Sequence, residues 1–183
     1  TKYATGGIIY PNCSNTGAIK VEATVNTDAK IGGIFGESLN ADKGAGTIGI
    51  ENTGEVSFSG VTKNLYIGGY AGYYDEASHS VQFTSRGAVK FDGVANNIAY
   101  VGGYVGEGAI KGSGTFQVVN NGDVKVLGYC PNLYVSGGFA KASLNKDGVI
   151  AGLKNTGNIE VPAVNVGDNV PTTLHMGGIF GLV

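Results

Sequence analysis

The side chains best suited to chemistry are tyrosines that recur at nearly constant spacing, at Tyr66, Tyr100 and Tyr134. Each lies just before a Gly-Gly pair, and the same place holds Lys30 in the preceding segment and His175 in the following one. If these residues stack down one face of the molecule, exposed tyrosine rings would suit flat ligands such as sugar rings. The alternative is a cross-strand tyrosine ladder that only stabilises a sheet. Because the position accepts lysine, we expect it to face solvent.

Catalytic and metal-binding patterns are scarce. The sequence has no Gly-x-Ser-x-Gly, P-loop or His-Glu-x-x-His motif, and its two histidines are far apart. Cys13 and Cys130 lack the spacing of a zinc site, and we expect no metal or other cofactor. Glu55 and Asp123 form the best carboxylate pair, because two strand spacings would place them about 9.6 Å apart. That separation is near the upper end of the range for inverting glycosidases.

Two further groups of residues could each be a binding site or a purely structural feature. Residues 70–76 hold three tyrosines followed by Asp75 and Glu76, and we expect one surface loop, whether or not it recognises a partner. Lys20, Lys90 and Lys125 follow equivalent turns and are predicted to point outward. Such a stripe could attract an acidic polysaccharide, but solvated charges that discourage edge-to-edge pairing explain it as well.

Composition excludes several classes of protein. Glycine makes up 33 of the 183 residues, charged residues are 14%, hydrophobic residues are 42%, and the formal net charge is −2. The chain is too apolar for a disordered segment and too neutral for a nucleic-acid binder that depends on neutralised phosphates. No run of residues reaches the length of a membrane span, so we expect no membrane insertion by this segment.

The element that must position these side chains is an internal repeat. Gly-Gly pairs occur at residues 6–7, 32–33, 68–69, 102–103, 137–138 and 177–178. A small polar triplet follows five of the pairs and ends at Gly17, Gly54, Gly87, Gly122 and Gly157. Two landmarks with the same period of about 35 residues indicate one structural unit per repeat.

Each repeat contains about three short strands. Apolar residues alternate with polar ones after every triplet, as in Val56 and Phe58, and similar runs precede the triplet and surround the Gly-Gly pair. We therefore predict an all-β fold, a right-handed parallel β-solenoid (β-helix) with one coil per Gly-rich repeat. The triplet asparagines would form an internal or corner ladder, and the glycine after them would permit a positive φ. Stacked antiparallel hairpins are the alternative.

Residues 1–183 are predicted to form a single repeat domain, an excerpt of a longer chain. The units are a short first unit at 1–30, then 31–65, 66–99, 100–134 and 135–175, with 176–183 starting another. Open strand edges at the ends predict contact with flanking repeats or self-association. Cys13 and Cys130 would lie three coils, about 14 Å, apart, which is too far for a disulfide.

Four segments share a Gly-apolar-x-Gly tetrad, at residues 33–36, 69–72, 103–106 and 178–181, while Gly138 is followed by Phe139, Ala140 and Lys141. This tetrad, followed by Asn-x-Gly and an alternating strand, resembles the GLUG-motif repeats of large bacterial surface and secreted proteins. The resemblance covers nearly the whole chain. It implies an extracellular or cell-surface location and a stalk or adhesive role, and it carries over no catalytic residue.

The function expected from these observations is that of a non-catalytic structural or adhesive repeat segment of a bacterial surface or secreted protein. The first alternative is a glycan-binding module that uses the column of Lys30, Tyr66, Tyr100, Tyr134 and His175. The second is a polysaccharide-degrading β-helix enzyme. Glycans or other surface proteins are the partners that these readings predict.

Overall fold

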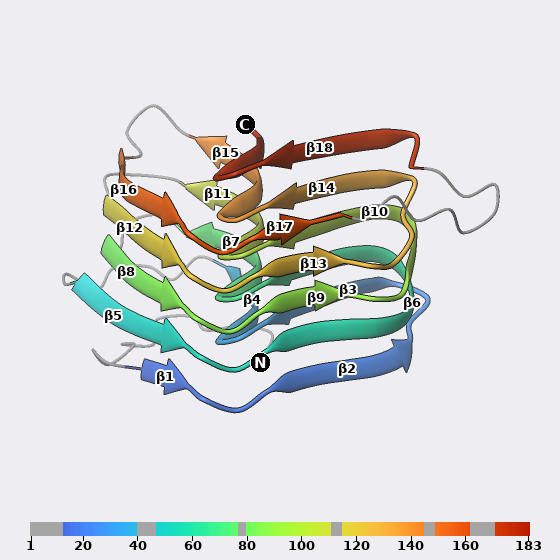
Figure 1. Cartoon of the computed structure of the whole chain (residues 1–183), viewed down its shortest axis with the longest axis horizontal. Helices are drawn as coiled ribbons and strands as arrows, with labels where there is room; N and C mark the ends of the chain where they lie inside the picture. Colours follow the sequence, from blue (N-terminus) through green and yellow to red (C-terminus); the bar gives the residue numbers. More distant parts are fainter. Residues whose placement is uncertain (1–12, 40–46, 77–79, 111–114, 145–148, 162–170) are drawn as a thin grey trace.

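In the computed structural model, residues 13–39, 47–76, 80–110, 115–144, 149–161 and 171–183 are described. They contain strands and turns, without a helix, and every pair of neighbouring strands is parallel. The strands of successive repeats stack into three sheets, which makes the chain a parallel β-solenoid (Figure 1). The all-β solenoid prediction is confirmed, and the antiparallel alternative is wrong.

Sheets 1 and 3 each contain five strands, one from each coil. Sheet 1 is formed by β1 (Cys13–Asn15), β5 (Thr47–Asn52), β8 (Ser80–Ser85), β12 (Thr115–Asn120) and β16 (Val149–Asn155). Sheet 3 is formed by β4 (Phe35–Leu39), β7 (Ala71–Glu76), β11 (Val105–Ile110), β15 (Phe139–Leu144) and β19 (Phe180–Leu182).

Sheet 2 has nine strands and bends into two limbs. Its first limb contains β2 (Ile19–Thr24), the start of β6 (Val56–Gly68), β9 (Val89–Phe91), β13 (Val124–Val126) and β17 (Ile159–Glu160). Its second limb contains β3 (Asp28–Gly32), the end of β6, β10 (Val94–Gly102), β14 (Asn132–Ser136) and β18 (Thr173–Gly177). Strand β6 passes through the bend and so belongs to both limbs.

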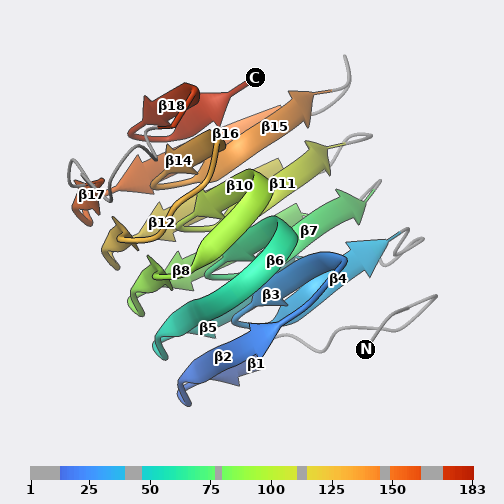
Figure 2. The same cartoon turned by 90° about the vertical axis from the view of Figure 1, so that its right-hand side faces the viewer.

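The chain winds in a right-handed sense, as predicted. In Figure 1 it crosses the front from β1 to β2, turns at the right and returns behind through β3, rising by one strand at each circuit. Figure 2 views this turn from the right-hand side, with β4, β7, β11 and β15 leading away from the second limb.

Two hydrophobic cores fill the coils. The first lies between the two limbs of sheet 2 and contains stacked rows such as Val56, Val89 and Val124, all fully buried. The second lies between sheets 1 and 3 and is aromatic, with Tyr70 and Tyr104 stacked at a centroid distance of 5.0 Å. Equivalent positions bury the same kind of side chain in successive coils, so one coil cannot close its core without its neighbours.

The two landmarks of the repeat, the Gly-Gly pair and the polar triplet, meet between these cores. A Cβ atom added to Gly103 would lie 2.4 Å from Asn120 Nδ2, and one added to Gly33 would lie 2.7 Å from Asn52 Cγ. The asparagines also bond to one another, because Asn120 Nδ2 donates to Asn155 Oδ1 at 2.8 Å. The predicted asparagine ladder is therefore internal, and the Gly-Gly pairs leave the space that it occupies.

The structure corrects the predicted role of the triplet glycines. In the described residues only Gly60 and Gly152 have a positive φ. Glycine is needed in the triplet because the coils approach closely there: a Cβ atom on Gly54 would lie 2.0 Å from the carbonyl oxygen of Gly17. Close backbone contact, and not the sign of φ, selects glycine.

The structure also corrects the alignment of one Gly-Gly pair and the reading of residues 70–76. Gly102 pairs with Ser136, so Gly138 occupies the apolar position of the tetrad and Ala140 the position of its last glycine. Residues 71–76 form strand β7, and Tyr70 and Tyr74 are buried, so no surface loop exists there.

Candidate functional site

The five residues predicted from spacing form one column on the outer face of the second limb. Strand pairing places Lys30 beside Tyr66, Tyr66 beside Tyr100, Tyr100 beside Tyr134, and Tyr134 beside His175. The ring centroids are 5.4, 5.0 and 4.9 Å apart along the column, and the last two rings are parallel within 4°. We call this row the tyrosine column.

The expectation that this position faces solvent is wrong at its centre. Tyr100 is only 5% exposed, whereas Tyr66 and Tyr134 are partly buried. Because each ring lies over the next, the ring faces are covered by the column itself. Sugar stacking needs an uncovered aromatic face, so the column offers a ligand mainly ring edges and hydroxyl groups.

A second column, which sequence reasoning missed, faces the first one across the junction between sheets 2 and 3. It contains Glu37, Tyr73, Glu107, Lys141 and Leu182 on successive strands of sheet 3. We call it the charged column. The Tyr66 and Tyr73 rings meet edge-to-face with centroids 6.0 Å apart, and an ion pair joins Lys30 to Glu37. The two columns therefore line a concave corner that runs along the solenoid, which we call the groove.

Charges in the groove are paired with one another. Lys141 Nζ donates to Glu107 Oε1 at 2.6 Å and lies 5.3 Å from the centre of the Tyr100 ring. The hydrogen bond to Glu107 is the largest influence that raises the pKa of Lys141. Burial, followed by the negative charges of Asp28 and Glu107, raises the pKa of Tyr66 to about 12. At neutral pH the Tyr66 hydroxyl group therefore keeps its proton and can donate a hydrogen bond.

A row of amides, exposed at Asn97 and partly buried at Asn64 and Asn132, flanks the tyrosine column on the same face. Asn97 Nδ2 donates to Asn64 Oδ1 at 2.8 Å, Asn64 Nδ2 donates to Asp28 Oδ1 at 2.7 Å, and Asn132 Nδ2 donates to the Asn97 carbonyl at 2.9 Å. We call Asn64, Asn97 and Asn132 the amide row. Its sequence signal was present, because Asn64 and Asn132 each stand two residues before a column tyrosine.

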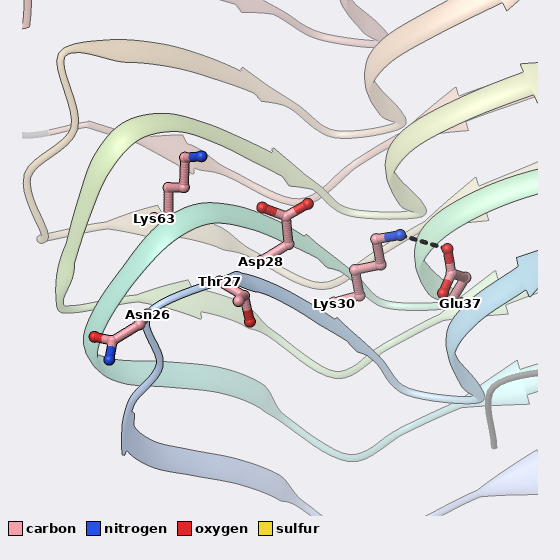
Figure 3. Close-up of a pocket in the computed structure, with 6 residues that line it drawn as sticks. All are labelled: Asn26, Thr27, Asp28, Lys30, Glu37 and Lys63. Atoms are coloured by element: carbon pink, nitrogen blue, oxygen red, sulfur yellow. Dashed lines mark hydrogen bonds and ion pairs between the residues drawn. The ribbon is translucent and has the colours of Figure 1, made fainter.

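A pocket of about 440 Å³ lies at the N-terminal end of the groove, where the first described coil meets the next (Figure 3). Its lining is entirely polar or charged and consists of Asn26, Thr27, Asp28, Lys30, Glu37 and Lys63. Two lysines and two carboxylates balance its charge. The pocket is shallow and open to solvent, so a ligand there would meet polar side chains and not an apolar cleft.

The remaining predicted groups serve contacts between coils. The backbone N–H groups of Val56 and Val89 bond to Ala88 and Asp123, which places Glu55 and Asp123 two coils apart in one row. The Asp123 carboxylate accepts a hydrogen bond from the Asn158 backbone N–H at 2.9 Å.

The lysine stripe forms one outward row, as its spacing predicted. Its members alternate with other residues in the order Lys20, Ser57, Lys90, Lys125 and Glu160. Lys125 pairs with Glu160 at 3.2 Å, so part of the positive charge is neutralised within the row.

Cysteine and metal chemistry add no further site in the described part of the chain. Neither Cys13, on β1 of sheet 1, nor Cys130, which lies within the first core, forms a disulfide. Burial raises the pKa of Cys130 to about 12. In the described ranges, no three His, Cys, Asp or Glu side chains are grouped so that they could hold a metal ion.

Comparison with protein-family models, with curated proteins and with solved structures finds no significant match to this chain. The described part of the chain also holds no helix that could serve as a membrane span.

Proposed function

We propose that this chain is a non-catalytic structural repeat segment that spaces or presents other parts of a bacterial surface or secreted protein. One observation carries the proposal: the residues that recur in every repeat are used to stack one coil on the next. Glycines allow close backbone approach, asparagines bond along the ladder, and apolar rows fill both cores. A stack of this kind is a stiff rod whose length depends on the number of coils.

The exposed core positions of the last strand support contact with further coils. Leu174 and Met176 are 51% and 57% exposed, although their partners on β14, Leu133 and Val135, are buried in the first core. We propose that a neighbouring coil covers them, either a flanking repeat or a second copy. Sedimentation of the chain at increasing concentration separates these cases, because only the second copy gives concentration-dependent mass.

Removing one complete coil tests the spacer proposal. Residues 88–122 span one repeat between the equivalent positions Gly87 and Gly122 and include β9, β10, β11 and β12. We expect the shortened chain to fold with unchanged strand content and to be shorter by about 4.8 Å in small-angle X-ray scattering. A chain that unfolds or keeps its length would contradict an additive stack, and release of oligosaccharides from a polysaccharide panel would contradict a non-catalytic role.

A further inference from the structure

We propose that the groove between the tyrosine column and the charged column binds an extended, uncharged glycan, held by hydrogen bonds and not by ring stacking. The pocket at the N-terminal end of the groove would hold one end of this ligand. The inference goes beyond the spacer role, which stands whether or not the groove binds a ligand.

The charge balance of the groove argues for an uncharged ligand. Lys30 pairs with Glu37, and Lys141 pairs with Glu107. The two columns that line the groove therefore carry no excess of either charge. The pocket repeats this balance, because Lys63 and Asp28 complete a set of two positive and two negative side chains. An anionic polymer would meet no unpaired cationic stripe here.

The backbone of the groove argues against a peptide. Strands β6, β10 and β14 each pair on both sides, as do β7 and β11 in sheet 3. Peptides that add to a sheet need a strand with free N–H and C=O groups. The inner strands of the groove walls offer none, and in the described chain free edges lie only at the terminal strands β3, β4, β18 and β19. Recognition must therefore use side chains, spaced by the distance between strands.

The uncharged polar side chains of the groove are suited to form hydrogen bonds with the hydroxyl groups of a sugar. The amide row offers Asn64, Asn97 and Asn132, each partly or well exposed, and the tyrosine column adds the hydroxyl groups of Tyr66 and Tyr134. Asn64 and Asn132 both pair with Ile98, and Tyr66 and Tyr134 both pair with Tyr100, so each kind of group recurs every second strand, about 9.6 Å along the axis. That distance is close to the length of two sugar rings in an extended chain. The geometry therefore fits a linear glycan lying parallel to the solenoid axis.

Two variants inside the groove and two outside it test the inference. Asn64→Ala removes one amide of the row, and Tyr66→Phe removes one hydroxyl group while keeping the ring contacts of the column. Gln82→Ala is the matched amide control, because Gln82 bonds to Gln117 at 3.1 Å on the outer face of sheet 1 and lines a different pocket of about 460 Å³. Tyr129→Phe is the matched tyrosine control, because Tyr129 lies at the bend of sheet 2.

The probes are uncharged hexasaccharides of β-linked glucose, mannose, xylose and N-acetylglucosamine, with a heparin hexasaccharide for comparison, measured by isothermal titration calorimetry. We expect at least one uncharged probe to bind. Each groove variant should weaken binding about fivefold, which corresponds to about 1 kcal/mol for one hydrogen bond, and neither control should change it. Circular dichroism should show the same fold for all four variants.

Three results would overturn the inference. One is the absence of binding by every uncharged probe at millimolar concentration. Another is binding that the groove variants leave unchanged. The third is binding of the heparin probe alone with loss at high salt, which would assign recognition to surface lysines instead. None of these results bears on the coil-deletion experiment. A wrong proposal about ligand binding in the groove can therefore be told apart from a wrong proposal about the spacer role.

Discussion

Replacing Ser85 by asparagine should complete the internal ladder and stabilise the protein. Ser85 is fully buried and occupies the ladder position between Asn52 and Asn120, with which it pairs in sheet 1. Its short side chain reaches only the Gly87 carbonyl, at 3.3 Å. The ladder is linked on both sides of this gap, because Asn15 Nδ2 donates to Asn52 Oδ1 at 2.8 Å and Asn120 is linked onward in the same way.

The gain follows from the bonds that an amide at this position can form. A side-chain amide can accept from Asn52 Nδ2 and donate to Asn120 Oδ1, which adds two hydrogen bonds of about 1 kcal/mol each. Ordering the longer side chain costs up to about 1 kcal/mol. The glycine that faces the gap, Gly69, has the same relation to Ser85 as Gly33 has to Asn52. We therefore expect a net gain of about 1 kcal/mol and a rise in Tm of about 2–4 °C.

Differential scanning calorimetry of Ser85→Asn and of the parent chain measures this rise. Ser57→Asn is the control, because Ser57 lies in the outward lysine row and gains no ladder partner. Asn120→Ala should lower the Tm, since it removes the bonds to Asn155 and to the Gly122 carbonyl. A Ser85→Asn chain that melts at or below the parent temperature would refute the reasoning, because it would mean that the gap has no room for an amide.

Three other measurements test different parts of the structure. Gly54→Ala should cost about 3 kcal/mol in urea unfolding, because the new Cβ atom would lie 2.0 Å from the Gly17 carbonyl oxygen. A thiol reagent should modify Cys13 in the native chain and Cys130 only after unfolding, since Cys130 is buried and burial raises its pKa to about 12; equal rates would contradict this. The pKa of Tyr66 is about 12 in the folded chain against 10.0 for a free side chain. Its contribution to stability should be present below pH 10 and lost as the pH rises toward 12, and Tyr66→Phe should flatten this part of the urea midpoint profile.

The register of the tyrosine column was predictable because two periodic signals agree. Alternation with period two fixes which face of a strand a residue occupies, and the 35-residue period fixes which residues become neighbours. Tyr66, Tyr100 and Tyr134 satisfy both, and the structure pairs them as their spacing predicts. The same reasoning placed Lys30 and His175 at the two ends of the column.

Prediction failed where a short pattern of glycines had more than one possible alignment. Residues 136–139 read Ser-Gly-Gly-Phe, so identity favours aligning Gly137 and Gly138 with the other pairs. The structure aligns Ser136 with Gly102 instead, because this keeps Phe139 in the buried position of Val105. Burial of an apolar side chain outweighs the match between glycines, even though this alignment leaves the Ser136 hydroxyl group buried without a hydrogen-bond partner.

The groove was not predictable because it depends on the direction of a bend. The chain turns between the second limb of sheet 2 and sheet 3 so that Tyr66 and Tyr73, seven positions apart in the sequence, face each other across a concave corner. The same turn directs Tyr70 and Tyr74 into the second core. Alternation alone tells that Tyr73 and Tyr74 lie on opposite faces, but it does not tell which face is concave.

Inner and outer positions of the repeat are under different physical constraints, and this difference indicates where recognition can arise. An inward residue contacts both neighbouring coils, so changing it disturbs two interfaces at once, as the contacts of Gly54 and Asn120 illustrate. An outward residue contacts its column neighbours but has solvent on its remaining side. Lysine, tyrosine and histidine can therefore occupy one column of the same stack without altering its interior. A solenoid of this kind can keep its coils uniform inside while an outward column changes from Lys30 through three tyrosines to His175, so any recognition of an extended ligand must arise on the outer face.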